Sequence, residues 1–334
     1  MDSPSTYPNP FSIDEIIRIE ESWFFDAASR VFQFQYHQNP VYRQWVDALR
    51  NEDPLSKPDF RQPVFLPISF YKTHQVIVSD AAPEIIFSSS GTTGLQTSRH
   101  FVQSLDWYQK SFTKAFNLFY GAPSDWAIIG LLPSYLERQG SSLVMMTEDL
   151  IKASGNEDSG LFLYDFGKLQ QVLQRREAAG EKTWLIGVTY ALLDFAERYP
   201  MPLQHTVIVE TGGMKGRKKE MTRMEVQEEL KQAFQLSTIH SEYGMTELLS
   251  QAYSKANGVF ICPPWMKVMV RDEDDPLSVK TAGTGALCII DLANLYSCSF
   301  IATEDLGKVH PDGSFEIMGR MDNSDVRGCS LLAL

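Results

Sequence analysis

The hydrophobic pattern in the middle of the chain alternates between short continuous apolar runs and longer amphipathic stretches. An apolar run at residues 126–132, for example, is followed by a helical pattern at residues 141–152. Continuous apolar strands that alternate with helices are typical of a mainly parallel sheet covered by helices on both faces. Further strands are predicted at residues 85–87, 162–163, 184–188, 206–210 and 237–240. Further helices are predicted at residues 107–119, 168–179, 192–198 and 218–234.

Both ends of the chain depart from this alternation. Near the start, Ser12 and Glu15 form a capping-box pattern, which predicts a helix to about residue 33. Asn39-Pro40 interrupts the helical pattern, and we expect a second helix to about residue 49 and a strand at residues 74–79. After about residue 258, short apolar runs separated by turns predict a β-rich part. Its strands are predicted at residues 267–270, 285–291, 299–303, 307–310 and 314–318.

These patterns together predict an α/β fold with mainly parallel sheets covered by helices and a smaller β-rich subdomain. The 334 residues are 43% hydrophobic and 22% charged, which is ordinary for a globular protein with a packed core. The predicted segments are an N-terminal helical segment packed on the main domain (1–80), an α/β nucleotide-binding core (81–257), the β-rich subdomain (258–322) and a mobile tail (323–334).

Charge and cysteine usage exclude several classes of protein. The formal net charge of −12 argues against binding of nucleic-acid backbones, and the basic cluster at residues 215–219 is more typical of a solvated face. No pair among the four cysteines has C-x-x-C spacing, which argues against a zinc site. The start of the chain lacks the pattern of a secretory signal, and no apolar run reaches the length of a membrane span. We therefore expect a cytoplasmic protein.

A loop rich in small hydroxyl residues and glycine follows the predicted strand at residues 85–87. Its residues are Ser88, Ser89, Ser90, Gly91, Thr92, Thr93 and Gly94. Glycine allows a tight backbone turn, and the N–H groups and hydroxyls offer many hydrogen-bond donors with little bulk, which suits a polyphosphate. The loop is not a Walker A motif, and a cluster of this kind alone is more often a solvated loop.

Two further stretches lie where predicted strands end, the usual place for a ligand in an open α/β sheet. Gly212-Gly213-Met214 follows the strand predicted at residues 206–210, and its glycines permit a close approach to a flat ligand, although a plain turn would have the same pattern. Asp305 is placed to accept hydrogen bonds from ribose hydroxyls. Arg320 is placed to donate to ribose or phosphate.

The stretch after the strand predicted at residues 237–240 carries the most varied chemistry. Tyr243 offers a ring that can stack on a base, Gly244 follows it, and Thr246 offers a hydroxyl to a phosphate. Glu247 is a candidate ligand for Mg²⁺, which prefers carboxylate and water oxygens. Taken singly, such an acidic residue is more often a solvated turn residue.

In this order, the four stretches resemble the motifs of the adenylate-forming enzymes, which include acyl-CoA synthetases and aryl ligases. The resemblance extends from about Phe87 to Arg320. It implies the large N-terminal domain of such an enzyme, with ATP and Mg²⁺ as cofactors and a carboxylic acid that is activated as acyl-AMP. It also implies that Thr246 and Glu247 are catalytic and that the remaining motif residues bind ATP.

A closer resemblance is to the acyl-protein synthetases of the LuxE type. It rests on residues 133–143 and on residues 324–330. It implies a fatty acid substrate, its transfer to Cys329 as a thioester, and its delivery to an acyl reductase or another acceptor protein. Tyr135 and Arg138 become candidates for the wall of the acyl pocket. His240 is a further candidate, although a hydrogen-bonded core histidine is about equally typical.

Two departures from the superfamily pattern leave alternatives open. Gly94 is followed by Leu95 instead of the usual Pro-Lys, so a phosphate-binding lysine is missing there and residues 98–100 are its candidate substitutes. The sequence also ends at Leu334, where coenzyme A ligases continue with a small domain. A shortened phenylacetate-type carboxylate–CoA ligase and a non-catalytic adenylate-binding subunit remain alternatives. The pattern does not specify the acyl chain, the acceptor or the oligomeric state.

Overall fold

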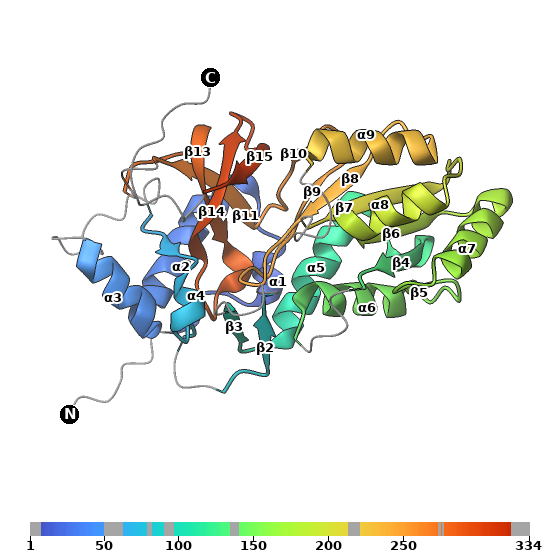
Figure 1. Cartoon of the computed structure of the whole chain (residues 1–334). Helices are drawn as coiled ribbons and strands as arrows, with labels where there is room; N and C mark the ends of the chain where they lie inside the picture. Colours follow the sequence, from blue (N-terminus) through green and yellow to red (C-terminus); the bar gives the residue numbers. More distant parts are fainter. Residues whose placement is uncertain are drawn as a thin grey trace, which may run out of the picture.

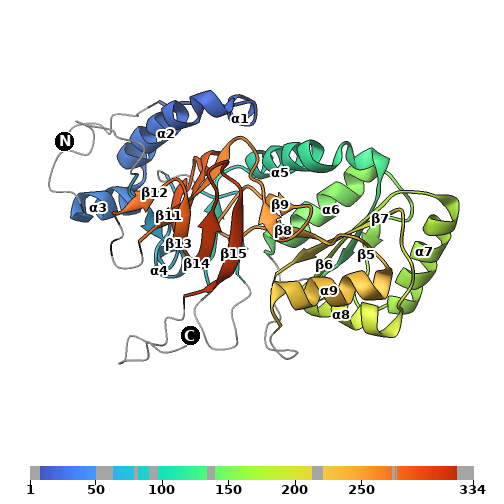
Figure 2. The same ribbon diagram turned by 90° about the horizontal axis from the view of Figure 1, so that it is seen from above.

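Two larger β-sheets lie side by side in the computed structural model, and helices pack around both (Figure 1). The structure describes residues 8–49, 63–78, 82–89, 97–133, 140–212, 221–272, 275 and 277–321. Figure 2 shows the same two layers from above, with the mainly parallel sheet on the right and the second sheet on the left. The predicted α/β class with a β-rich part is therefore confirmed.

The first sheet has six strands in the order β5-β4-β6-β7-β8-β9. Its strands are β4 (Ala127–Leu131), β5 (Gly160–Leu161), β6 (Thr183–Val188), β7 (Thr206–Thr211), β8 (His240–Tyr243) and β9 (Ala252–Ser254). All neighbours pair in parallel except β8 and β9, which are antiparallel. Every residue of β4 and β6 is buried, as continuous apolar strands predict for a sheet covered on both faces.

Helices cover both faces of this sheet. They are α5 (Leu105–Tyr120), α6 (Ser142–Ser154), α7 (Phe166–Ala179), α8 (Thr189–Arg198) and α9 (Arg223–Phe234). Figure 2 shows α8 and α9 on one face and α5 and α6 on the other. Capping residues set the helix ends: the Ser141 side chain accepts from the backbone N–H of Val144 at the start of α6, and Gly155 ends it in the left-handed conformation.

The second sheet is largely antiparallel, with the order β10-β15-β14-β13-β11-β12, and β1 pairs in parallel with β14. Its strands are β1 (Leu66–Pro67), β10 (Val259–Phe260), β11 (Met266–Arg271), β12 (Val279–Lys280), β13 (Gly283–Asp291), β14 (Phe300–Val309) and β15 (Phe315–Arg320). The two strands predicted at residues 299–303 and 307–310 form one strand, β14, with a register shift between Leu306 and Gly307. A Cβ at Gly307 would collide with the carbonyl oxygen of Glu316, so glycine is required there.

The N-terminal helices and a short hairpin complete the second layer. These elements are α1 (Ile13–Ile16), α2 (Phe24–Gln38), α3 (Pro40–Leu49), α4 (Phe70–Thr73), β2 (Ile85–Ser88) and β3 (Arg99–Val102), with 3₁₀ turns η1 (Glu21–Trp23), η2 (Pro123–Asp125) and η3 (Leu292–Asn294). Gln35 anchors α2, because its buried amide donates to the carbonyl oxygens of Asn294 and Leu295. The hairpin of β2 and β3 pairs Ser88 with Arg99.

Several predicted elements differ from the structure. The strand expected at residues 162–163 forms two residues earlier, as β5. The helix expected to residue 33 is divided, because α1 ends at Ile16 and α2 begins at Phe24. The strand expected at residues 74–79 does not form at the described residues 74–78. There the backbone N–H of Val78 makes one hydrogen bond to the carbonyl oxygen of Tyr296 and belongs to no β-ladder. The strand expected to end at residue 240 instead begins there, which places Tyr243 on the strand itself.

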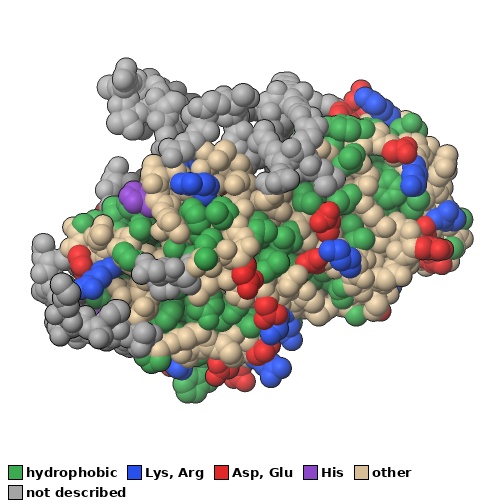
Figure 3. Space-filling view, turned by 90° about the horizontal axis from the view of Figure 1, so that it is seen from below, with side chains coloured by type: hydrophobic (Ala, Val, Ile, Leu, Met, Phe, Trp, Pro, Cys, Tyr) green, Lys and Arg blue, Asp and Glu red, His purple; other side chains and the backbone are tan. Residues whose placement is uncertain are grey.

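The surface carries acidic and basic side chains that are interspersed. On the face in Figure 3, the coloured Lys and Arg side chains lie singly, most of them beside Asp or Glu. None of the described helices has both the length and the apolar character that crossing a membrane requires.

Candidate active site

The predicted motifs meet where the carboxyl ends of β7 and β8 approach β14 and β15 of the second sheet. Tyr243, the last residue of β8, donates its hydroxyl to Oδ2 of Asp305 on β14 at 2.8 Å. Arg320, at the end of β15, donates from Nε to Oδ1 of the same carboxylate at 3.1 Å. Asp305 and Arg320 are direct partners in the ladder between β14 and β15. Asp305 therefore joins two motifs that are distant in the sequence.

The two donors to Asp305 differ in exposure. The Tyr243 ring is buried and packs edge-on against Phe260 and Phe315, with centroids 5.9 Å and 5.4 Å away. The Arg320 side chain is 72% exposed, whereas that of Asp305 is 9% exposed. Within the described residues, the Arg320 guanidinium makes hydrogen-bonding contact with Asp305 alone, so its other N–H groups can reach a ligand.

Thr246 and Glu247 follow Tyr243 on the segment that leaves β8. Thr246 is partly exposed, and Glu247 is buried. Burial raises the pKa of the Glu247 carboxyl, while a hydrogen bond from Ser98 and the charges of Arg320 and Lys72 act in the opposite direction. The influence of Arg320 on both Glu247 and Asp305 places these two carboxylates in one electrostatic environment.

A buried histidine fixes the backbone of this segment. His100 on β3 contacts the carbonyl oxygen of Thr246 through Nδ1 at 2.8 Å and the amide oxygen of Asn294 through Nε2 at 3.0 Å. Asn294 in turn donates to the carbonyl oxygen of Glu247 at 2.7 Å. Burial lowers the pKa of His100 to about 4, so the imidazole is neutral near pH 7. The sequence marked His100 only as a candidate replacement for a lysine, because its contact with Thr246 spans distant segments.

The base of the predicted phosphate loop lies beside the same segment. Ser89 and Ser98 close the base of the loop, because the backbone N–H of Ser89 donates to the carbonyl oxygen of Ser98 at 3.0 Å and the N–H of Ser98 donates to Oγ of Ser89 at 2.9 Å. Ser88 donates from its backbone N–H to the carbonyl oxygen of Gly140. Ser98 also contacts Glu247, which brings this hairpin to the carboxylate. The remaining loop residues lie outside the described residues; they are Ser90, Gly91, Thr92, Thr93 and Gly94.

The end of β7 supplies the predicted glycine turn. Gly212 has a φ of +77°, a conformation that favours glycine. Its carbonyl oxygen lies 2.6 Å from the hydroxyl of Thr189, which also contacts the buried carboxylate of Glu210. Gly213 and Met214 lie outside the described residues. The structure thus shows the entry to this turn at the same sheet edge as Tyr243.

The candidates for the acyl pocket are only partly described. His240, at the start of β8, stacks on Tyr120 with centroids 5.8 Å apart, and burial lowers the pKa of its imidazole to about 4. Tyr135, Arg138 and the proposed acyl acceptor Cys329 lie outside the described residues. Their roles stay predictions.

The chemistry of the site fits Mg²⁺ with a single protein carboxylate. In the described part of the chain, no group of three or more His, Cys, Asp or Glu side chains could hold a metal ion. Mg²⁺ takes much of its coordination from water and substrate phosphates, so one carboxylate suffices. Glu247 is buried and receives one side-chain hydroxyl, which leaves it able to accept a cation.

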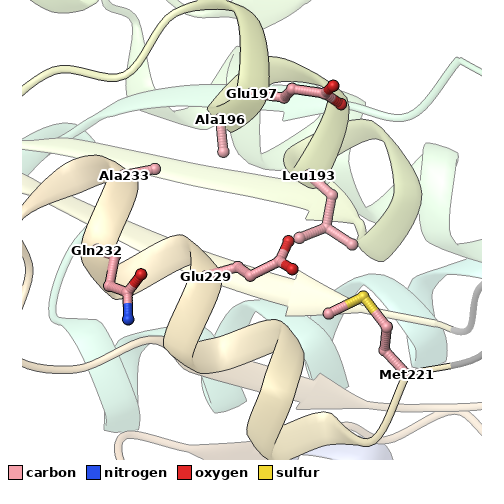
Figure 4. Close-up of a pocket in the computed structure, with 7 residues that line it drawn as sticks. All are labelled: Leu193, Ala196, Glu197, Met221, Glu229, Gln232 and Ala233. Atoms are coloured by element: carbon pink, nitrogen blue, oxygen red, sulfur yellow. The ribbon is translucent and has the colours of Figure 1, made fainter.

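A groove with a volume of about 570 Å³ lies elsewhere, between α8 and α9. Figure 4 shows the side chains that line it, which are Leu193, Ala196, Glu197, Met221, Glu229, Gln232 and Ala233. None of them belongs to the predicted motifs, so this groove is separate from the candidate active site.

Comparison with known proteins supports the fold. No family model and no curated protein matches the chain. Its structure is similar to ATP-bound MatB from Rhodopseudomonas palustris, with a TM-score of 0.54 and 16% identity over 73% of this chain and 49% of that one.

It is also similar to O-succinylbenzoate coenzyme A synthetase (MenE) from Bacillus subtilis in complex with ATP and magnesium ion. That comparison has a TM-score of 0.51 and 15% identity and covers 72% of this chain and 51% of that one. The chain thus spans about half the length of these structures. The two likenesses confirm the predicted fold class.

Proposed function

We propose that this protein activates a carboxylic acid with ATP. A carboxylate oxygen of the acid attacks the α-phosphorus, the bond from phosphorus to pyrophosphate breaks, and acyl-AMP forms. The observation that carries the proposal is the contact of Tyr243 and Arg320 with one carboxylate, Asp305, beside the buried Glu247. Three residues that the sequence predicted for one nucleotide, from separate segments, thereby meet between the two sheets.

Asp305 and Arg320 suit the ribose and phosphates of the nucleotide. Each oxygen of Asp305 accepts one protein donor and keeps a further lone pair for a ribose hydroxyl. Arg320 retains N–H donors that can reach a phosphate oxygen. The fixed position of Asp305, held from two sides, reduces the entropy lost when the ribose binds.

Thr246 and Glu247 suit the reacting phosphate. In this proposal the Thr246 hydroxyl donates to an α-phosphate oxygen as negative charge develops there. Glu247 would hold Mg²⁺, which neutralises charge on the phosphates when it is bound. His100 and Asn294 hold the carbonyl oxygens of Thr246 and Glu247, so the segment keeps its geometry during the reaction.

The further course of the acyl group is the second part of the proposal. Transfer to Cys329 would break the mixed anhydride, release AMP and form a thioester for delivery to a reductase or another acceptor. The described cysteines are unsuited to this role, because burial raises the pKa of Cys262, Cys288 and Cys298 to about 12. A fatty acid is the substrate that the sequence resemblance implies.

Acid-dependent exchange of labelled pyrophosphate into ATP tests the first part. We expect exchange with at least one member of a panel of fatty, aromatic and amino-substituted acids, and no exchange without acid. Nucleotide binding without exchange would select a non-catalytic adenylate-binding subunit. AMP release that requires coenzyme A would instead select a carboxylate–CoA ligase.

Covalent labelling tests the second part. After incubation with ATP and a labelled acid that supports exchange, the denatured chain should carry label that hydroxylamine removes. The Cys329→Ser variant should lose this label, whereas Cys262→Ser should keep it. Label that persists in Cys329→Ser would exclude Cys329 as the acceptor.

A further inference from the structure

A second buried carboxylate lies beside the candidate active site and has no part in the proposed chemistry. Glu242 precedes Tyr243 on β8 and is 8% exposed. Its Oε2 accepts the hydroxyl of Thr211, its direct partner on β7. Because side chains alternate along a strand, Glu242 and Thr211 occupy the sheet face opposite to Ser241 and Glu210. Ser241 contacts Gln227 of α9, so Glu242 faces α5 and α6.

The Glu242 carboxylate turns toward the catalytic segment. A Cβ at Gly244 would collide with Oε1 of Glu242 and would lie 3.4 Å from Cγ of Gln251. Glycine at this position therefore leaves room for both side chains beside the backbone that continues to Thr246. The carboxylate and the Gln251 amide flank the same short stretch of chain.

This cluster contains buried polar atoms that have no hydrogen-bond partner among the described residues. The buried Oε1 of Gln251 has no partner among the described residues, and Oε1 of Glu242 receives no donor from that part of the chain. The hydroxyl of Tyr253 is also buried and unpartnered there. The nearby Tyr108 hydroxyl is already committed, because it donates to the carbonyl oxygen of Ser142. A buried acceptor without a donor is rare in folded proteins, so Oε1 of Gln251 requires an explanation, and a donor from a ligand supplies one.

No described cation compensates the charge of Glu242. Burial raises the pKa of this carboxyl to about 7, the Thr211 hydroxyl opposes the increase, and the charge of Glu210 adds to it. Burial raises the pKa values of the surrounding phenols, Tyr108, Tyr120 and Tyr253, and the Glu242 charge adds to each increase. Lys255 is exposed, and its Nζ lies over the ring of Tyr120, 5.8 Å from the ring centroid. Aromatic rings around a carboxylate form a setting that attracts an organic cation.

We propose that the acid activated here carries a primary ammonium group at its far end, received by Glu242 and Gln251. This inference rests on the proposed function and names its substrate class. An ammonium group offers three N–H donors, which match the two acceptor oxygens and a tyrosine ring. An alkyl chain in the same place would leave both oxygens without donors. The substrate is thus an amino-substituted acid, in contrast to the fatty acid that the sequence implies.

Acids of equal length that differ in one terminal group test the inference. Exchange is measured with 6-aminohexanoate, heptanoate and heptanedioate, which end in an ammonium, a methyl and a carboxylate group. For the wild-type protein we expect kcat/KM to favour 6-aminohexanoate over heptanoate by at least about tenfold. Glu242→Gln should reduce this preference to near unity, and Glu242→Lys should transfer it to heptanedioate. Glu228→Gln, which changes an exposed carboxylate on α9, should leave the ratio unchanged.

A binding measurement separates this inference from the proposed function. Exchange with heptanoate equal to that with 6-aminohexanoate, and a ratio unaffected by Glu242→Gln, would overturn the inference while the proposed function stands. Absence of exchange with every acid would instead contradict the proposed function. In that case the thermal unfolding midpoint is measured with and without 6-aminohexanoate. A rise for the wild type but not for Glu242→Gln supports the ammonium site. An equal change for the two proteins overturns it.

Discussion

The hydroxyl of Tyr243 donates a 2.8 Å hydrogen bond to Asp305, a residue 62 positions further along the chain. The bond connects the last residue of β8 in the parallel sheet with β14 in the second sheet. It is a structural joint between the two sheets. It is also part of the candidate active site, because Asp305 accepts a second hydrogen bond from Arg320. Changes at this joint should therefore affect both stability and nucleotide binding.

Removal of the Tyr243 hydroxyl tests the joint. Tyr243→Phe leaves Oδ2 of Asp305 without its protein donor, which should lower the free energy of unfolding by about 1–2 kcal/mol. It should also weaken ATP binding, since Asp305 loses one of its two supports. Urea unfolding and nucleotide titration measure the two effects, with Tyr164→Phe at an exposed position as the control. Unchanged ATP affinity in Tyr243→Phe would show that the hydrogen bond between Tyr243 and Asp305 has no role in nucleotide binding.

Glu247 is expected to be essential for the chemical step. Glu247→Gln keeps the shape of the side chain and removes the charge that would hold Mg²⁺, so exchange should fall by roughly 10²–10³-fold. The exposed Glu229→Gln on α9 serves as a matched control and should retain exchange. Near-normal exchange in Glu247→Gln, at any magnesium concentration, would exclude the proposed metal role.

His100 is a positioning residue in this account. His100→Leu removes the contacts with Thr246 and Asn294, so the protein should lose about 1–3 kcal/mol of stability. Exchange should show a lower kcat with a nearly unchanged KM for ATP, because the segment that reacts is displaced while the ribose site remains. His205→Gln at an exposed position is the control. A loss of stability with an unaltered kcat would assign His100 a purely structural role.

The pH dependence of stability should reveal the buried Glu242. Its pKa is about 7 in the folded protein, above the ordinary value of 4.5, so the folded state binds more protons between these two pH values. Stability from this group is therefore present below pH 4.5 and is lost as the pH rises to 7, by up to about 3 kcal/mol. The titratable groups near it are His240, Lys255, Tyr108, Tyr120 and Tyr253, together with Glu210 on the opposite face of the sheet.

Comparison of the wild type with Glu242→Gln isolates this contribution. The buried Asp291, whose pKa is raised to about 6, titrates in both proteins and cancels in the difference. The unfolding free energy of the wild type should decrease relative to that of Glu242→Gln between pH 4.5 and pH 7. Parallel pH profiles for the two proteins would show that Glu242 has an ordinary pKa.

Much of the fold was predictable because local patterns and tertiary structure agree in the parallel sheet. The strands β4 and β6 are continuous apolar runs, and both are buried on both faces. The segment around Val78 was predicted wrongly for the opposite reason. It has an apolar pattern typical of a strand, but Val78 donates to Tyr296, a contact that only the tertiary structure determines.

The candidate site was predictable in its residues but only partly in its contacts. The motif order identified Tyr243, Asp305 and Arg320, yet it assigned the Tyr243 ring to a base and gave no sign of its bond to Asp305. Glu242 was missed altogether, because an acidic residue beside a turn motif is usually solvated. Its burial depends on Gly244 and on packing against α5 and α6, which no local pattern encodes.

The loops between the two sheets are proposed to hold one molecule of ATP. A crystal structure of the protein with Mg²⁺ and a non-hydrolysable ATP analogue tests this proposal most directly. We expect the ribose hydroxyls at Asp305, the phosphates between Arg320 and the hairpin of β2 and β3, and the metal ion at Glu247. A nucleotide bound elsewhere, for example in the groove between α8 and α9, with Asp305 in contact only with Tyr243 and Arg320, would contradict it.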